Sequence, residues 1–399
     1  MKLAIIVNSF PSISEKFLLN QIISISKIDK NIDFTIFAGV KSLDKKQHSL
    51  FQNPIFSNRI INLNIPRAVW KRYLYLPILF FICFFRSPKY TFRSFSIKHY
   101  NKTAINLKNL FFLKYFNKCH YDIIHCHFGQ NGLIGAFLKD CNFCNKLIVT
   151  FHGTDITTIS NNYSPNIYRY MFTRVDHITS GSNFIKNKII EHGGNNITII
   201  PMGIDVSPLT TTSNRYNFLS IGRLVDVKGF IYSIAAFKII SKNFPSCNYL
   251  IAGNGPLYFV LQNEISKNNL LNRIILLKDR TSTELETLFS TTLALIVPSI
   301  RSSDGSEEGQ CLVIQEAAIQ GIPSIGTNTG GIPEGIINGS TGWIVQEKNS
   351  ISLSEKMNFF LENPEQSIKM GNNAYNYAVK EYDNIKIVTD LINNVYYDN

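Results

Sequence analysis

The sequence predicts an α/β protein of two Rossmann-like, doubly wound domains that face a central cleft. Its 399 residues exceed what one ordinary core accommodates. Short apolar runs alternate with helical segments, which is typical of parallel βα units. This series occurs twice, and the Thr- and Ser-containing segment Gly203–Asn214 separates the two copies. We expect domains at 1–205 and 206–375, and a C-terminal helix at 376–399 that packs back toward the first domain.

The first series starts with Leu3–Val7, an apolar run that predicts a strand buried on both faces. A turn-forming segment follows, and Ser14 is placed to cap a helix over about Glu15–Lys27. Further strands are expected at Asp33–Ala38, Asp122–Cys126, Lys146–Phe151, His177–Gly181 and Ile197–Ile200.

The second series begins near Tyr216 and follows the same pattern. Strands are expected at Asn217–Ile221, Tyr249–Ala252, Arg273–Leu277, Leu293–Pro298, Ser324–Gly326 and Trp343–Val345. Helices are expected between them at about Lys228–Lys242, Leu257–Asn268, Ser282–Phe289 and Gly309–Gln320. The tail after Pro364 has a helical pattern. Ligands of doubly wound sheets bind at the carboxyl ends of the strands, so the residues there are the candidates for function.

The net charge of +12 comes from one part of the chain. Between Asp44 and Asp122 there are 14 Lys and Arg and no Asp or Glu, whereas the remaining residues are nearly balanced. The same window is rich in aromatic residues, and we expect it to be an insertion over about 66–118. Its longest apolar run, Tyr73–Phe85, has 13 residues and contains Pro77. A membrane-spanning helix needs about 20 residues, so a transmembrane segment is not expected.

Three interpretations of this window remain open. A helix lying in an anionic membrane surface fits cations that flank an aromatic stretch. A buried helical hairpin with lysines on its outer face is the structural alternative. Nucleic-acid binding has only charge and aromatic residues in its favour, so no nucleic-acid partner is expected. The start of the chain lacks a secretory pattern, and the odd number of seven cysteines fits reduced thiols. We therefore expect a cytoplasmic protein at the inner face of the cell membrane.

The turn after Asn217–Ile221 combines flexibility with positive charge. Gly222 allows a sharp turn, and Arg223 and Lys228 follow just before a predicted helix. Two cations beside helix N–H groups suit a diphosphate, although Arg223 paired with a carboxylate and a solvated Lys228 are the structural alternative. After the next strand, Gly253 and Gly255 are expected to allow close approach of a ligand.

The loop after Leu293–Pro298 contains two carboxylates eight residues apart, Glu308 and Glu316. With a helix starting near Gly309, their spacing corresponds to a rise of about 12 Å, the scale of a nucleotide-sugar. One carboxylate would then accept ribose hydroxyls and the other sugar hydroxyls. The alternative for Glu308 is simple stabilisation of a helix N-terminus.

Histidines cluster at the ends of two strands of the first half. His152, followed by Gly153 and Asp155, ends one strand and is a candidate for contact with substrate. A zinc site built from nearby histidines and cysteines was weighed, but Cys141 and Cys144 lack a convincing second pair. No metal is expected.

These motifs together resemble the retaining glycosyltransferase family 4 with the GT-B fold. The resemblance rests on Gly222-Arg223 with Lys228-Gly229 and on the Glu308…Glu316 pair. Four further stretches resemble its colanic-acid and amylovoran-type exopolysaccharide branch: Phe10–Glu15, His125–Gly129, Phe151–Ile156 and Gly330–Glu334.

The resemblance implies a role for each matching residue. Arg223 and Lys228 would hold the donor diphosphate, Glu316 the ribose, and Glu308 the transferred sugar. Gly309 and Gln310 would offer backbone N–H groups, and His152 would contact the donor sugar or assist near the acceptor. The sequence departs from the family at Gln310-Cys311 and at Asn254.

We therefore expect a retaining, metal-independent hexosyltransferase without a cofactor. Its donor would be a nucleotide-sugar, with UDP favoured, and its acceptor a lipid-linked or oligosaccharide molecule in bacterial exopolysaccharide or O-antigen synthesis. An epimerase or phosphorylase on the same fold, and a non-catalytic nucleotide-sugar-binding module, are the alternatives.

Overall fold

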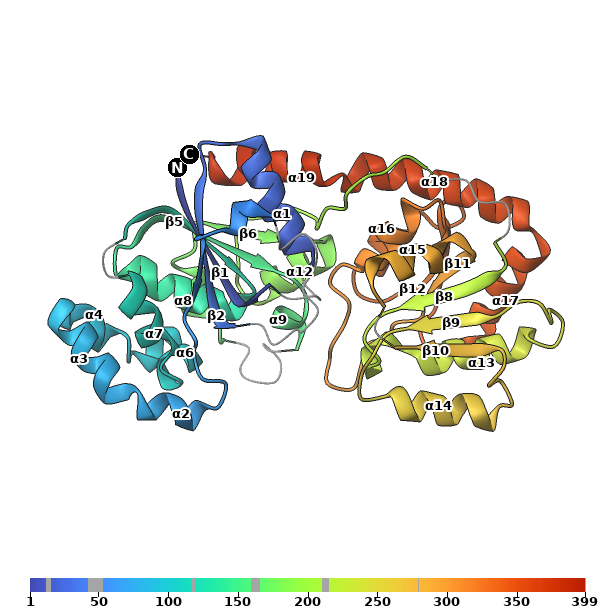
Figure 1. Cartoon of the computed structure of the whole chain (residues 1–399), viewed down its shortest axis with the longest axis horizontal. Helices are drawn as coiled ribbons and strands as arrows, with labels where there is room; N and C mark the ends of the chain where they lie inside the picture. The colour runs from blue at the N-terminus through green and yellow to red at the C-terminus, as the bar shows by residue number, and fades with distance from the viewer. Residues whose placement is uncertain are drawn as a thin grey trace. The chain divides into compact units, whose positions relative to one another are not determined.

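The computed structural model describes residues 1–11, 16–41, 53–116, 119–158, 166–209, 215–278 and 280–398. The chain forms two compact units, which we describe separately. Unit 1 comprises Met1–Gly203 and Asn384–Asn399, and unit 2 comprises Ile204–Asp383. Each unit is built on one parallel sheet with helices packed against it (Figure 1). The predicted α/β class with two Rossmann-like halves is confirmed. The helix cap predicted at Ser14 lies outside the described residues, and so do residues 210–214 of the predicted linker.

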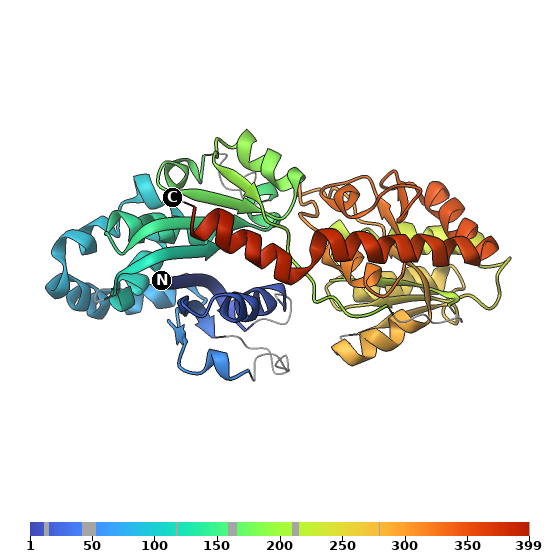
Figure 2. The same ribbon diagram turned by 90° about the horizontal axis from the view of Figure 1, so that it is seen from above.

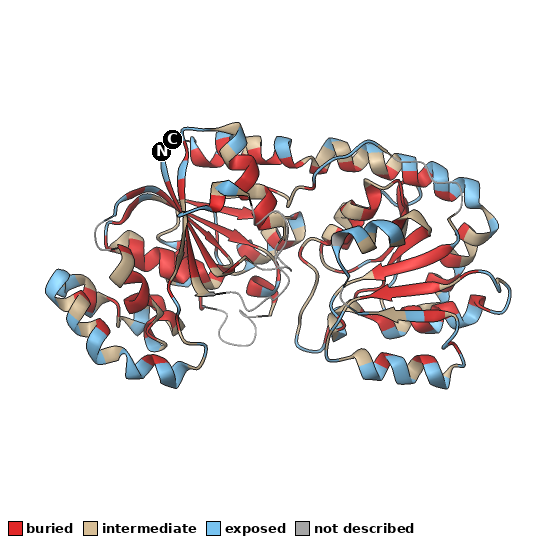
Figure 3. Ribbon diagram, in the orientation of Figure 1, coloured by how far each residue is buried: buried red, intermediate tan, exposed pale blue. Residues whose placement is uncertain are grey.

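Unit 1 has a seven-stranded sheet in the order β3-β2-β1-β4-β5-β6-β7. Every neighbouring pair is parallel. The strands are β1 (Lys2–Phe10), β2 (Asp33–Lys41), β3 (Ile60–Asn62), β4 (Tyr121–His127), β5 (Cys144–Phe151), β6 (His177–Ser180) and β7 (Ile197–Ile199). The central strands are buried on both faces, as the continuous apolar runs predicted (Figure 3). Strand β3 was not predicted, because three half-buried edge residues carry little pattern.

The helices on the sheet of unit 1 are α1 (Lys16–Ile28), α8 (Gly129–Asp140), α9 (Thr154–Thr157), α11 (Arg169–Phe172), α12 (Asn183–Glu191) and α19 (Asn384–Leu391). The last of these comes from the C-terminal tail and packs on α1 (Figure 2). Asn384 Nδ2 donates to Ser24 Oγ at 2.8 Å. Beyond α19, a π-helical turn (Ile392–Tyr396) carries the buried side chain of Tyr396 into the core of unit 1.

The basic window of the sequence forms a run of six short helices at the edge of unit 1 (Figure 1). They are α2 (Val69–Leu74), α3 (Leu76–Arg86), α4 (Pro88–Arg93), α5 (Ile97–Tyr100), α6 (Lys102–Ile105) and α7 (Lys108–Phe116). Within the described residues, no helix is both long and apolar enough to cross a bilayer.

One buried carboxylate joins these helices to the sheet domain. Asp140, at the end of α8, is 1% exposed and accepts hydrogen bonds from the hydroxyls of Tyr100 and Tyr170, each at 2.6 Å. Its other oxygen lies 2.6 Å from the guanidinium of Arg174. The helical insertion is therefore fixed to unit 1 rather than loosely attached.

Unit 2 has a six-stranded parallel sheet in the order β10-β9-β8-β11-β12-β13. The strands are β8 (Asn217–Ile221), β9 (Tyr249–Ala252), β10 (Ile274–Leu277), β11 (Thr292–Val297), β12 (Ser324–Thr327) and β13 (Gly342–Val345). Its helices are α13 (Phe230–Ile240), α14 (Tyr258–Lys267), α15 (Ser282–Ser290), α16 (Leu312–Ala318), α17 (Ser350–Glu362) and α18 (Pro364–Tyr382). Most elements lie where the sequence predicted them. The helix expected from Gly309 is the exception, because it begins at Leu312.

Candidate functional site

The residues singled out in the sequence fall into one group in each unit. In unit 2 they lie after β8, after β11 and in α16, which places the loops at the carboxyl ends of neighbouring parallel strands. In unit 1 the group surrounds His152 after β5. Each group is described within its own unit.

In the turn after β8, the side chain of Lys228 packs against Gly222. A Cβ on Gly222 would lie 3.2 Å from Cε of Lys228, so the lysine side chain packs closely over this glycine. Lys228 ends a 3₁₀ turn (Asp226–Lys228), and Gly229 then adopts φ of 60° to start α13. A Cβ on Gly229 would lie 2.1 Å from the carbonyl oxygen of Pro298. The turn is therefore packed directly against the end of β11, which together with the positive φ explains the need for glycine at position 229.

Lys228 and Glu308 form an ion pair at the centre of this group. The Nζ of Lys228 lies 2.8 Å from Oε1 of Glu308, and the two side chains are 21% and 13% exposed. Ser299 Oγ donates to the same carboxylate oxygen at 3.4 Å. Burial disfavours the charge of Lys228, but the Glu308 carboxylate outweighs burial and raises the pKa of Lys228 to about 12. The solvated Lys228 considered in the sequence is therefore wrong.

The backbone of Glu308 is held by a pair of glycines. The carbonyl of Glu308 accepts a hydrogen bond from the N–H of Gly331 at 2.8 Å, and a Cβ on Gly330 would come within 2.3 Å of that carbonyl oxygen. This contact holds residue 308 in the loop before α16. The prediction that Glu308 and Glu316 are related by the rise of one helix is thus wrong, because only Glu316 lies in α16.

The other predicted residues of unit 2 lie around this pair. Arg223 is exposed, and its charge is close enough to Lys228 to lower the pKa of that lysine slightly. Gly309 is buried, and Gln310 and Glu316 are half-buried. The structure thus brings Lys228 and Glu308 into contact, with the charge of Arg223 close to Lys228.

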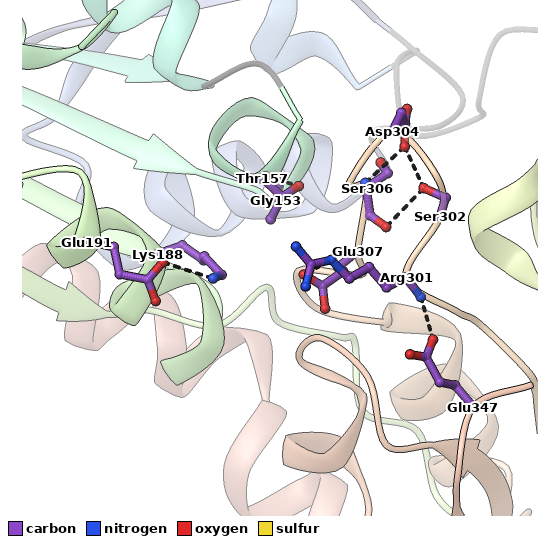
Figure 4. Close-up of polar contacts among 10 residues, drawn as sticks. All are labelled: Gly153, Thr157, Lys188, Glu191, Arg301, Ser302, Asp304, Ser306, Glu307 and Glu347. Atoms are coloured by element: carbon purple, nitrogen blue, oxygen red, sulfur yellow. Dashed lines mark hydrogen bonds and ion pairs between the residues drawn. The ribbon is translucent and has the colours of Figure 1, made fainter. Parts of the chain in front are cut away.

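The loop before Glu308 is fixed by its own polar contacts (Figure 4). Asp304 accepts hydrogen bonds from Ser302 Oγ at 2.5 Å and from the N–H of Ser306 at 2.9 Å, which lowers the pKa of its carboxyl. The N–H of Arg301 donates to Glu347 at 2.6 Å. The polar loop is therefore folded by its own hydrogen bonds.

The glycines after β9 pack closely against the turn after β8. A Cβ on Gly253 would lie 1.9 Å from the carbonyl oxygen of Gly222, and one on Gly255 would lie 2.4 Å from that of Leu224. Gly253 also adopts φ of 157°. These glycines allow close approach of the neighbouring turn of the chain itself, which contains Gly222 and Arg223.

In unit 1, Asp155 organises the turn that carries His152. The Asp155 carboxylate is buried and accepts backbone hydrogen bonds from Gly129 at 2.9 Å, Gly153 at 2.8 Å and His152 at 3.1 Å. Burial raises the pKa of this carboxyl, although the three N–H groups favour its ionised form. The carboxylate therefore joins the ends of β4 and β5. Phe128, between them, adopts φ of 71°, which is unusual for a residue with a side chain.

Three imidazoles form a row here, in which His125 and His127 are buried and His152 is half-buried. His127 Nδ1 is 3.2 Å from His152 Nε2, and the rings of His125 and His127 stack with centroids 4.5 Å apart. His125 is further held by Thr150 Oγ1 at 2.7 Å and by the hydroxyl of Tyr396 at 2.8 Å. Burial lowers the pKa of His125 and of His152 to about 3. Both imidazoles are neutral at physiological pH.

No group of three or more His, Cys, Asp or Glu side chains suited to a metal ion occurs among the described residues. Cys141 and Cys144 are buried, and burial raises the pKa of both thiols. A thiol with a raised pKa is a poor metal ligand, since metals bind the thiolate.

Sequence reasoning missed two residues that hold the predicted ones. In the sequence Ser299 is only the first residue of a loop, yet in the structure its hydroxyl contacts Glu308. Tyr396 lies 271 residues from His125, and no local pattern connects a C-terminal tyrosine with a strand-end histidine. The apolar spacing of the tail was the only signal available.

Comparison with known proteins covers most of the chain. The family model described as Glycosyl transferases group 1 matches residues 206–377, and the model described as Glycosyltransferase Family 4 matches residues 84–208. An uncharacterized glycosyltransferase of Methanocaldococcus jannaschii, MJ1178, is 32% identical over 65% of this chain and 71% of its own length. The putative colanic acid biosynthesis glycosyltransferase WcaL of Escherichia coli is 25% identical over 90% of both chains.

The fold also matches solved structures. The crystal structure of Anabaena Alr3699/HepE in complex with UDP and glucose superimposes with a TM-score of 0.72. The match covers 99% of each chain at 16% sequence identity. At this identity the likeness concerns the fold alone.

Proposed function

Because this chain belongs to the glycosyltransferases of family 4 and group 1, we propose that it transfers a hexosyl unit from a nucleotide-sugar, with UDP as the expected nucleotide. The proposed acceptor is a lipid-linked or oligosaccharide molecule in the synthesis of a bacterial surface polysaccharide. The relative WcaL, named for colanic acid biosynthesis, and the UDP complex of HepE support these choices. The glycosyltransferase activity itself follows from the family.

The observation that carries the donor assignment is the Lys228–Glu308 pair at the end of β8 and β11. A half-buried cation whose charge is stabilised beside a carboxylate suits a ligand that is anionic at one end and rich in hydroxyls at the other. Lys228 and Arg223 bind the diphosphate, and Glu308 accepts hydrogen bonds from the sugar. The backbone N–H groups of Gly309 and Gln310 assist, and Glu316 binds the ribose.

The proposed transfer retains the anomeric configuration and uses no metal. The acceptor oxygen attacks the anomeric carbon from the side of the leaving group, as the bond from that carbon to the phosphate oxygen breaks. The leaving phosphate takes the acceptor proton, so the products are the glycoside and the nucleoside diphosphate. Lys228 and Arg223 supply the positive charge that stabilises this leaving group.

His152 supports the same chemistry in a different way. With a pKa near 3, its imidazole is a weak base and remains neutral, so it is suited to hydrogen bonding and not to removing a proton at neutral pH. We assign it to contact with a sugar hydroxyl. This assignment leaves the leaving phosphate as the base.

The enzyme is proposed to work at the inner face of the cell membrane, where a lipid-linked acceptor would be presented. The exposed aromatic side chains and the excess of Lys and Arg in the insertion support this location.

The test is release of the nucleoside diphosphate from purified protein supplied with a donor and a lipid-linked oligosaccharide acceptor. Release should require both substrates, and Lys228→Ala or Glu316→Ala should abolish it. Lys238→Ala and Glu286→Ala, at exposed positions of α13 and α15, are matched controls that should retain activity.

Product analysis separates the alternatives. An epimerase would convert the donor without an acceptor, and a phosphorylase would consume inorganic phosphate. Full turnover in Lys228→Ala and Glu316→Ala would contradict the site assignment. The anomeric configuration of the product, determined by NMR, would contradict retention if it were inverted.

A further inference from the structure

The outer side of helices α2 and α3 is unusually apolar for a solvent-facing surface. Trp70, Leu74, Ile78, Phe81 and Phe85 are between 59% and 78% exposed. They follow one another at intervals of four, four, three and four residues, so they repeat on the outward side of the two helices. We call these five residues the α2–α3 stripe. Figure 3 shows these helices largely in the colour of exposed residues. Large exposed apolar surfaces usually mark an interaction site.

The inner side of the same helices is well packed, so the stripe is not a misplaced core. Leu79 and Cys83 are buried, and Cys83 Sγ donates to the carbonyl of Leu110 in α7. Arg72 is buried as well, and its guanidinium donates to the carbonyls of Pro66, Arg67 and Asn106. The helices are thus fixed with the stripe facing outward.

A layer of aromatic rings supports the stripe from within. Phe80 and Phe84 stack with centroids 5.5 Å apart, and Phe92 of α4 contacts both rings edge-on at 6.1 and 5.9 Å. Phe92 is itself 62% exposed, so α4 adds to the apolar surface. The surface is preformed, and binding would not require the helices to fold.

The charged residues on the helices that carry the stripe, and on the rest of the insertion, are all positive. Residues 45–121 include no Asp or Glu, and Arg67, Lys71, Arg86 and Lys89 are exposed on or beside α2–α4. A second copy of this surface would bring cations against cations, which disfavours self-association through the stripe. A binding partner of this surface must therefore offer an apolar layer beneath a negatively charged surface.

A shallow concavity of about 510 Å³ lies at the start of α2. It is lined by Pro66, Arg67, Ala68, Trp70, Lys71, Leu74 and Tyr75. Lys71 Nζ lies 5.4 Å from the centre of the Trp70 ring. Two cations beside an aromatic wall suit the phosphate of a lipid headgroup, with the tryptophan ring at the level of the interface.

We propose that the α2–α3 stripe docks this chain on an anionic lipid bilayer, with the stripe entering the acyl boundary and Arg67 and Lys71 at the phosphates. An apolar face of this kind enters about 5–10 Å into the interface. The inference specifies the membrane location of the proposed function. It is tested without donor or acceptor, so its failure would leave the transferase proposal untouched.

The first measurement uses the two tryptophans of the chain, Trp70 and Trp343. In full-length Trp343→Phe protein, Trp70 is the only tryptophan. Vesicles of 30% phosphatidylglycerol in phosphatidylcholine should shift its emission to the blue, and lipids brominated on the acyl chains should quench it. Absence of both effects in protein that sediments with the vesicles would overturn the proposed face.

The second measurement compares sedimentation of variants with those vesicles. Phe81→Ser with Phe85→Ser should weaken binding at least tenfold, because two exposed rings no longer enter the interface. Phe259→Ser is the matched control, since Phe259 is 75% exposed on α14 of unit 2, and it should bind as the parent does. Equal loss in both variants, or no loss in the double variant, would contradict the proposal.

The last measurements test the contribution of charge and the competing partners. Lys71→Gln with Lys89→Gln should lower the salt dependence of vesicle binding, and neutral vesicles should bind weakly. Unchanged salt dependence would overturn the electrostatic part. Dimerisation without lipid, or binding to a soluble polyanion that the Phe81 and Phe85 changes abolish equally, would assign the stripe to another partner and so refute membrane docking.

Discussion

Replacing Asp155 by Asn tests how the turn that carries His152 is built. The carboxylate is 1% exposed and accepts hydrogen bonds from three backbone N–H groups, those of Gly129, His152 and Gly153. An amide has one acceptor oxygen, so its NH₂ group would face at least one N–H donor. Each hydrogen bond to a charged group contributes about 1.5–3 kcal/mol.

The expected loss of unfolding free energy follows from these contacts. One or two charge-assisted bonds are lost, and burying a neutral amide instead of a charge offsets part of that loss. We expect Asp155→Asn to lower the free energy of unfolding by roughly 2–4 kcal/mol. For a unit of this size, each kcal/mol corresponds to about 2–4 °C in Tm.

Urea and thermal unfolding, followed by circular dichroism, measure this change. Asp122→Asn is the matched control, because Asp122 is exposed and accepts one bond, from the N–H of Lys2. It should change stability by less than about 1 kcal/mol. The reasoning is refuted if both variants lose the same stability, or if Asp155→Asn unfolds like the parent.

Three further predictions concern the ion pair and the buried histidines. Lys228→Met should lower the free energy of unfolding at pH 8 by about 1–3 kcal/mol, because Glu308 loses its ion-pair partner. The pKa of Lys228 in the folded protein is raised to about 12, so the stabilisation by the pair is lost as pH rises from about 10.5 toward 12. Over that pH range the variant should therefore lose less unfolding free energy than the parent. The pKa of His125 is lowered to about 3, so its neutral form stabilises the fold above about pH 6.5 and this contribution falls toward pH 3; urea titrations should show a shallower pH slope in His125→Gln. Tyr396→Phe should cost about 1–3 kcal/mol in urea unfolding, whereas Tyr397→Phe, at an exposed tyrosine of the same tail, should change stability little, and equal losses would contradict the buried role.

The sequence predicted the strands well because their burial leaves a direct mark. Leu3–Val7 is apolar throughout and Asn217–Ile221 is mostly apolar, and the structure places a strand over each run, although β1 continues through the expected turn residues Asn8 and Ser9 to Phe10. Edge strand β3 has no such mark, since its three residues are only half-buried.

Contacts between distant loops explain what the sequence did not predict. Glu308 was expected next to a helix start, but its backbone lies in a loop that contacts Gly330 and Gly331. The resemblance identified the motif Gly330–Glu334, but the sequence did not predict that its glycines contact the backbone of Glu308. Long-range packing of this kind is invisible to local periodicity.

The same limit applies to the histidines and to the insertion. That His125 and His152 belong to one row of histidines depends on the parallel register of β4 and β5. The sequence suggested either a membrane helix or a buried hairpin for Tyr73–Phe85. The structure has two helices there, packed on one side and apolar on the solvent side, so the buried hairpin is wrong, and the helix lying in a membrane surface stays a prediction.

Binding of a nucleotide-sugar to unit 2 is the most direct test of the central claim. We would measure the thermal stability of the protein with UDP-, GDP-, ADP- and CMP-sugars, each in large excess. At 100 times its Kd, a donor stabilises the folded state by about 2.7 kcal/mol. We expect a rise in Tm with one base family, UDP first, that is lost in Glu316→Gln and kept in Glu286→Gln. No rise with any donor, or the same rise in Glu316→Gln, would contradict the assignment of this site.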